Sequence, residues 1–143
     1  MIDTPTSSAT GRCLCGTVHY RIHGPLRPVI SCHCSHCLRS HGHYSAYTAV
    51  GREHLDILGE EALRWYDSQD PEVKARRGFC GHCGSSLFWQ SSESSLISIS
   101  AGTLDRPTGL STACHIYVAD AGDYYRLGDD LPRWHQAEGQ QTP

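Results

Sequence analysis

Three cysteines stand within six residues in the stretch Cys32-His33-Cys34-Ser35-His36-Cys37. The spacing C-x-C-x-x-C allows three thiolates from one tight loop to face a single metal ion. Zinc in proteins takes four ligands, mostly cysteine sulfur or histidine nitrogen, arranged as a tetrahedron. A distant residue in the fourth position makes such a site structural, whereas water or substrate in that position makes it chemically active.

Two cysteine pairs elsewhere in the chain form a second candidate site. Each pair is followed directly by glycine, which lets the backbone turn closely around an ion. The pairs are Cys13/Cys15 and Cys80/Cys83, which lie more than sixty residues apart. The most economical partition combines them into a closed, structural four-sulfur zinc site that clips distant segments together. We therefore expect two zinc ions per chain.

Other roles for these residues remain open. Cys80-Gly81-His82-Cys83 has the letters of a redox motif, but such motifs open a helix, and the segment after Cys83 predicts a strand. Both sites are structural if His33, His36 or Cys114 completes the second one. Otherwise His33 and His36 are hydrogen-bonding neighbours of the site or lie exposed, and Cys114 is a small buried hydrophobic residue. His115 is a further candidate to face the second metal.

Short strand-like segments must position these cysteines. Val18, Tyr20 and Ile22 alternate with polar residues, the period-two pattern of a half-buried strand. Comparable segments predict strands at 29–32, 44–50, 55–57, 63–65, 87–90, 96–100 and 115–118, and a short helical turn at 35–41. Glycine and proline separate these segments and no long amphipathic helix is present, so we expect a mainly β fold.

Length and composition limit the possible classes of protein. The 143 residues suit one domain, and with only 38% apolar residues its core would gain from a metal staple. We expect a flexible lead-in at 1–10, a zinc-binding, catalytic-type domain at 11–134 and a polar tail at 135–143.

Charge and hydropathy argue against two kinds of partner. A net charge of −3 with a single lysine argues against nucleic acid. No apolar run approaches the ~18 residues of a membrane helix, and no secretory signal is visible. A cytoplasmic, reducing location is expected, where clustered cysteines are more often metal ligands or redox groups than disulfides.

Six motifs follow one another along the chain: Gly11-x-Cys13-x-Cys15-Gly16-x-Val18, Cys32-His33-Cys34-x-x-Cys37, Phe79-Cys80-x-x-Cys83-Gly84-Ser85, Gly102-x-Leu104-Asp105, His115-Ile116 and Leu131-Pro132. In this order and spacing they resemble the glutathione-dependent formaldehyde-activating enzyme family, which also includes centromere protein V. The resemblance covers about residues 11–134. One departure is Leu38, because the family often carries a basic residue after the third cysteine of this loop.

The resemblance implies an Mss4-like, mainly β fold of short antiparallel strands stapled by two zinc ions. It implies a structural site formed by Cys13, Cys15, Cys80 and Cys83. It also implies a catalytic site with an open position formed by Cys32, Cys34 and Cys37.

A zinc ion held by three thiolates is weakly Lewis acidic and suits the binding of a fourth thiol as a thiolate. The first hypothesis is therefore a carbon–sulfur lyase resembling S-(hydroxymethyl)glutathione synthase. Its substrate is the adduct of a glutathione-like thiol and a small aldehyde such as formaldehyde. The alternative is a non-catalytic, zinc-stabilised binding module or a carrier of the thiol adduct. An exchangeable ligand at the second zinc distinguishes the two hypotheses.

Overall fold

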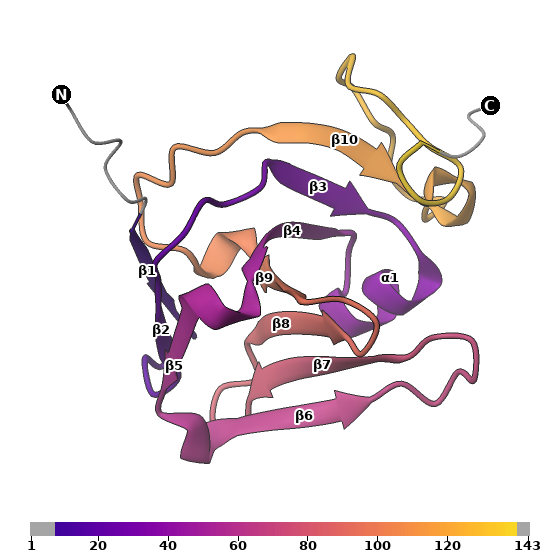
Figure 1. Ribbon diagram of the computed structural model, residues 1–143. Helices are drawn as coiled ribbons and strands as arrows, with labels where there is room; N and C mark the ends of the chain where they lie inside the picture. Colours follow the sequence, from indigo (N-terminus) through magenta and orange to yellow (C-terminus); the bar gives the residue numbers. More distant parts are fainter. Residues whose placement is uncertain (1–7, 140–143) are drawn as a thin grey trace, which may run out of the picture. The chain divides into compact units, whose positions relative to one another are not determined.

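The computed structural model describes residues 8–139, so the expected lead-in at 1–10 and tail at 135–143 lie partly outside the described residues. Strands dominate this part of the chain (Figure 1), as the sequence predicts. The strands are β1 (Ala9–Arg12), β2 (His19–Ile22), β3 (Val29–Cys32), β4 (Ser45–Gly51), β5 (Leu55–Leu58), β6 (Leu63–Asp67), β7 (Ala75–Cys80), β8 (Ser86–Ser91), β9 (Leu96–Ser100) and β10 (Thr112–Ile116).

The helices are all short. They are α1 (Ser35–His41) and the 3-10 helices η1 (Arg52–His54), η2 (Glu60–Ala62), η3 (Ala101–Thr103) and η4 (Val118–Asp120). None of the helices in residues 8–139 has the length and apolar character needed to cross a membrane.

The chain divides into two compact units, of which the first contains residues up to Arg27 together with 48–109. Its strands form the hydrogen-bonded series β1-β2-β5 and the series β9-β8-β7-β6, in which neighbouring strands are close in sequence. Strands β6, β7 and β8 lie side by side in Figure 1. The turn between β7 and β8 carries the second cysteine pair of the four-cysteine group.

The apolar periodicity of β2 builds much of the core of this unit. Val18, Tyr20 and Ile22 are at most 1% exposed, whereas the alternating His19 and Arg21 face solvent. The Tyr20 ring meets the Phe88 ring of β8 edge-on, with 5.6 Å between centroids. Aromatic pairs of this geometry stabilise a core beyond the area they bury.

Strand β1 begins inside the segment expected to be a flexible lead-in. Ala9 pairs with Ile22 and Thr10 pairs with Arg21, and the Thr10 hydroxyl donates a hydrogen bond to Asp105 at 2.6 Å. Ala9 and Thr10 therefore belong to the folded unit. The polar Thr/Ser composition of the segment gave no strand pattern, because its order comes from the partner strand and from Asp105.

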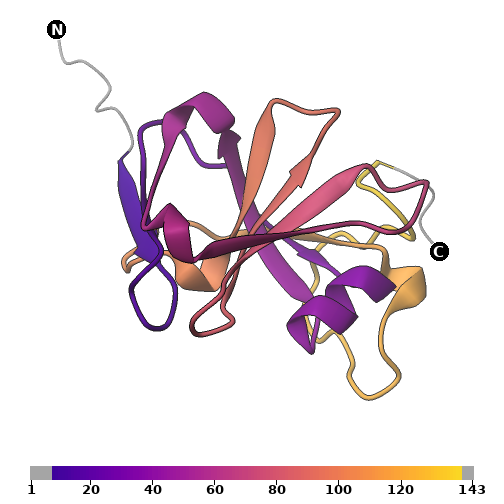
Figure 2. The ribbon, with the colours of Figure 1, turned by 90° about the horizontal axis from the view of Figure 1, so that it is seen from below.

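The second unit contains residues 28–47 and the described chain from Leu110 onward. Strand β3 pairs antiparallel with the part of β4 that belongs to this unit, and β10 pairs parallel with β3, with Ile116 opposite Cys32. The segment after β10 lies beside α1 (Figures 1 and 2). The parallel pair differs from the expectation of antiparallel strands, since β3 and β10 are distant in sequence and no hairpin constrains their direction.

The last strand ends earlier than the predicted range of 115–118. Tyr117 adopts a left-handed backbone conformation, with φ 57° and ψ 36°, and η4 follows immediately. This conformation is incompatible with an extended strand, so β10 ends at Ile116.

A glycine at the start of η2 makes the tightest approach to neighbouring backbone. Gly59 has a φ of +73°, and a Cβ there would overlap the Thr17 carbonyl oxygen. We expect Gly59→Ala to lower the free energy of unfolding by about 3 kcal/mol, because backbone strain and overlap add. Gly109→Ala has the same strain, with φ +71° and open space, and is expected to cost only about 1 kcal/mol. Urea denaturation measures the free energy of unfolding of both variants. Equal decreases in the two variants would contradict the contribution assigned to overlap with the Thr17 carbonyl oxygen.

Candidate metal centres

The first candidate centre is the group of four cysteines in the first unit. The sulfur atoms of Cys13, Cys15, Cys80 and Cys83 all lie within 4.8 Å of one another. The Cys15 sulfur is 3.6 Å from that of Cys13 and 3.8 Å from that of Cys80. Tetrahedral zinc with Zn–S bonds of about 2.3 Å requires sulfur–sulfur separations of about 3.8 Å. The donor set and its spacing therefore fit zinc.

Two turns of similar construction present these sulfur atoms. In the turn between β1 and β2, Gly16 donates its N–H to the Cys13 carbonyl at 3.1 Å. In the turn between β7 and β8, Gly84 donates to the Cys80 carbonyl at 2.8 Å. Both glycines have a positive φ, +83° and +79°, which other residues adopt only with strain. Because Cys80 ends β7 and Cys83 lies in the turn to the antiparallel β8, not at the start of a helix, the redox-motif alternative lacks its structural context.

Hydrogen bonds and burial act in opposite directions on these thiols. Burial raises the pKa of Cys13 to about 11, whereas the Ser85 hydroxyl lowers the pKa of Cys83 to about 5. Backbone N–H groups donate to sulfur at Cys13, from Val18 at 3.4 Å, and at Cys80, from His82 at 3.3 Å. N–H donors favour the thiolate form, and a bound cation compensates the charge of the buried sulfur atoms.

The second candidate centre lies where β3 passes into α1. Cys32 ends the strand, Cys34 caps the helix, and Cys37 is buried in its first turn. The Cys34 sulfur accepts the Cys37 backbone N–H at 3.3 Å. The three sulfur atoms lie within 4.8 Å of one another, and within residues 8–139 no histidine, carboxylate or further cysteine joins the group.

Three thiols this close do not ionise independently. The neighbouring thiols of Cys34 and Cys37, and then burial, raise the pKa of Cys32. Three thiolates in such a space require a cation, and an all-sulfur donor set suits zinc. Cys114 is only 2% exposed and lies outside the group, as a small buried hydrophobic residue would.

His33 is completely buried and hydrogen-bonded at both ring nitrogens. Its Nε2 lies 2.9 Å from His115 Nδ1, and its Nδ1 lies 2.7 Å from the Tyr125 hydroxyl. His115 Nε2 lies 2.9 Å from Asp129 Oδ2. Because both nitrogens of each imidazole are engaged, neither His33 nor His115 offers a fourth metal ligand in this arrangement.

The chain of hydrogen bonds has a consistent direction. The hydrogen bond from His115 lowers the pKa of Asp129, so the carboxylate accepts from His115 Nε2–H. Burial lowers the pKa of His33 to about 4, which leaves its imidazole neutral at pH 7. The neutral His33 ring carries one proton; when this proton is on Nε2, it is donated to His115 Nδ1, and His33 Nδ1 accepts from the Tyr125 hydroxyl. The network fixes the loop that carries Cys32 and Cys34.

Four residues around this centre were not identified as functional from the sequence. Tyr44 packs on His33 with 4.4 Å between ring centroids, and Tyr125 and Asp129 end the hydrogen-bonded chain. Tyr117 follows the strand that pairs with β3. The adjacent Tyr124-Tyr125 pair was visible as aromatic sequence, but no spacing relates these residues to cysteines some eighty positions away.

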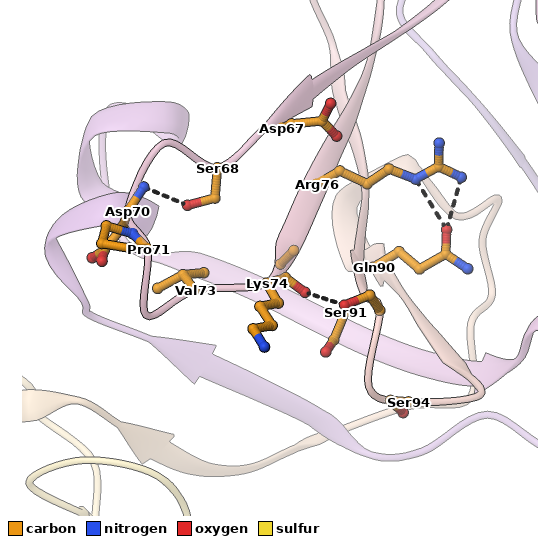
Figure 3. Close-up of a pocket in the computed structure, with 12 residues that line it drawn as sticks. Asp67, Ser68, Asp70, Pro71, Val73, Lys74, Arg76, Gln90, Ser91 and Ser94 are labelled. Atoms are coloured by element: carbon orange, nitrogen blue, oxygen red, sulfur yellow. Dashed lines mark hydrogen bonds between the residues drawn. The ribbon is translucent and has the colours of Figure 1, made fainter.

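A separate hollow of about 540 Å³ lies in the first unit, between the start of β7 and the end of β8 (Figure 3). Its lining combines polar side chains with Pro71, Val73 and Ala75 and contains no cysteine or histidine. The Arg76 guanidinium donates to the Gln90 side chain at 3.0 Å and lies over the Trp65 ring at 3.8 Å. Because the cysteines of this unit are at the opposite end of β7, the hollow is separate from the candidate metal centre.

A mainly β chain with two compact cysteine groups of zinc-ligand chemistry has the character of an Mss4-like zinc protein. The family model described as glutathione-dependent formaldehyde-activating enzyme matches residues 8–120. The chain belongs to this family, whose description names glutathione and formaldehyde.

The structure is similar to a crystal structure of a Rhodobacter sphaeroides protein. The TM-score is 0.57 at 22% sequence identity, and the match covers 72% of this chain and 97% of the other. At this identity the similarity supports the fold alone. No curated protein matches the chain significantly.

Proposed function

We propose that this chain joins and separates the sulfur of a glutathione-like thiol and the carbon of a small aldehyde such as formaldehyde. The observation that carries the proposal is the three-sulfur group of Cys32, Cys34 and Cys37, which contains no fourth protein ligand within residues 8–139. The four-sulfur group is complete by comparison, so we assign it a structural role. Family membership supports the choice of glutathione and formaldehyde.

When held by the three cysteines, zinc supplies a position that a substrate thiol occupies as a thiolate. In the addition, a sulfur lone pair forms the bond to the aldehyde carbon. The π electrons of the C=O bond move to oxygen, which takes a proton from water, and the proton that the thiol lost on binding neutralises the hydroxide that remains. The reverse sequence is the lyase reaction.

At this step the protein acts more by positioning the bound thiol than by acid–base catalysis. The Cys37 N–H holds the Cys34 sulfur, and the His33 backbone N–H donates to the Ile116 carbonyl at 3.0 Å. The buried imidazole pair fixes the loop from its other side. Holding the thiol beside a small aldehyde replaces a bimolecular encounter by a local one.

The state of the cysteines is consistent with the proposed chemistry and with a cytoplasmic location. All eight are free of disulfides. Reducing compartments maintain cysteines in this form through glutathione and related thiols.

Exchange between free and thiol-bound ¹³C-formaldehyde, measured by NMR at equilibrium, tests the proposal. We expect the zinc-loaded protein to raise the exchange rate roughly tenfold or more over the uncatalysed addition, because the thiol is pre-positioned. Cys34→Ala is expected to return the rate to the uncatalysed value, whereas the control Cys114→Ala retains the acceleration. An uncatalysed rate in the zinc-loaded wild type would favour the binding-module or carrier alternative.

A further inference from the structure

The tyrosines of the second unit fall into two groups. Three have hydroxyls that bond an imidazole: Tyr47 with His41 at 2.9 Å, Tyr124 with His43 at 2.6 Å and Tyr125 with His33 at 2.7 Å. The hydroxyls of Tyr44 and Tyr117 have no hydrogen-bond partner within residues 8–139. A phenol that is half-buried and unpartnered has its donor available for a ligand.

Tyr117 also has an unusual backbone. Within the described chain it is the one non-glycine residue with a positive φ, at 57°. The conformation is costly for a bulky residue and persists only where neighbouring bonds enforce it. Here the Tyr117 N–H donates to the Gln136 carbonyl at 2.8 Å, and the Tyr117 carbonyl accepts from Asp120 at 3.0 Å. Enforced strain of this kind concentrates at functional sites.

The turn at Tyr117 starts beside the three-cysteine loop. Ile116, the preceding residue, pairs with Cys32, and its carbonyl accepts the His33 backbone N–H at 3.0 Å. Burial, and then negative charge at Cys32 and Cys34, raise the pKa of Tyr117. The pairing of Ile116 with Cys32 places the Tyr117 backbone next to the three-cysteine loop.

We propose that Tyr117 is a catalytic residue whose hydroxyl donates a hydrogen bond to the aldehyde-derived oxygen of the thiol adduct. The inference rests on the proposed function. As the carbon–sulfur bond forms, the C=O π electrons move to oxygen, and the Tyr117 O–H stabilises the charge that develops there. Water supplies the proton of the final hydroxyl, and the proton released by the binding thiol neutralises the resulting hydroxide. The overall reaction consumes one thiol and one aldehyde and gives one hydroxyalkyl thioether.

Calorimetric binding to the zinc-loaded protein tests this role without relying on turnover. The probes are glutathione alone and glutathione premixed with ¹³C-formaldehyde, with NMR identifying the adduct. We expect Tyr117→Phe to bind glutathione within twofold of wild type and the adduct about tenfold more weakly, because one hydrogen bond to the oxygen is lost. The control Tyr124→Phe, which removes an exposed hydroxyl bonded to His43, is expected to keep both affinities.

The outcomes separate this inference from the proposed function. If Tyr117→Phe lost affinity equally for glutathione and for the adduct, or lost affinity for neither, the role of the Tyr117 hydroxyl would be overturned. Binding of glutathione by the wild type would still support the proposed function. Failure of the wild-type protein to bind glutathione would refute both the proposed function and the role of Tyr117. Tyr117→Gly adopts the left-handed turn without strain, and it is expected to fold and to show the same selective loss.

Discussion

Cys83→Ala is expected to unfold the protein, whereas Cys34→Ala is expected to leave it folded. Cys83 belongs to a group whose members come from turns more than sixty residues apart, so a metal bound there would hold distant strands together. A structural zinc site contributes on the order of 10–16 kcal/mol, which matches or exceeds the net stability of about 5–15 kcal/mol of an ordinary domain. Cys34 belongs to a group contained within six residues, and its loop is also held by His33 and β10.

Metal analysis and thermal unfolding of both variants measure the difference. Wild type purified without chelator is expected to hold two zinc ions per chain, and Cys34→Ala to keep the structural ion with a cooperative thermal transition. Cys83→Ala is expected to show no cooperative transition at 25 °C or above. A folded Cys83→Ala beside an unfolded Cys34→Ala would reverse the assigned roles of the two groups. Disulfides with no zinc in wild type would refute the metal assignment itself.

Local spacing accounts for what the sequence could predict about the fold and the cysteine groups. The alternation of Val18, Tyr20 and Ile22 sets which face of β2 is buried, because side chains along a strand point to opposite faces. The spacing of Cys32, Cys34 and Cys37 brings three sulfur atoms together through one helix cap. These features depend on neighbours in sequence, so the chain order alone indicates them.

Features that depend on distant partners were not predictable in this way. Ala9 and Thr10 are ordered by β2 and Asp105, although their composition resembles a flexible segment. The partner of His33 is His115, 82 residues away. The left-handed Tyr117 is imposed by bonds from the C-terminal segment, and no residue type signals it. The hydrogen-bond donors and acceptors around the second centre could therefore be identified only from the structure.

Cobalt substitution makes thiol coordination at the second centre visible. Cobalt–thiolate absorption bands report each added sulfur, and the four-cysteine site is already closed, so only the centre at Cys32, Cys34 and Cys37 can respond. Glutathione loses a proton when it binds as a thiolate. Its apparent affinity is therefore expected to rise about tenfold per pH unit and to level off near the thiol pKa of about 8.5.

The decisive measurement is a titration of glutathione into the cobalt-loaded protein, followed by these bands. We expect a shift that saturates at one glutathione per chain, occurs at lower glutathione concentration as pH rises and is lost or strongly weakened in Cys34→Ala. Cys114→Ala, which removes a buried cysteine outside both groups, is the matched control and is expected to titrate like wild type. An unchanged spectrum at saturating glutathione in the intact, cobalt-loaded protein would contradict thiol coordination at this centre and, with it, the proposed carbon–sulfur chemistry.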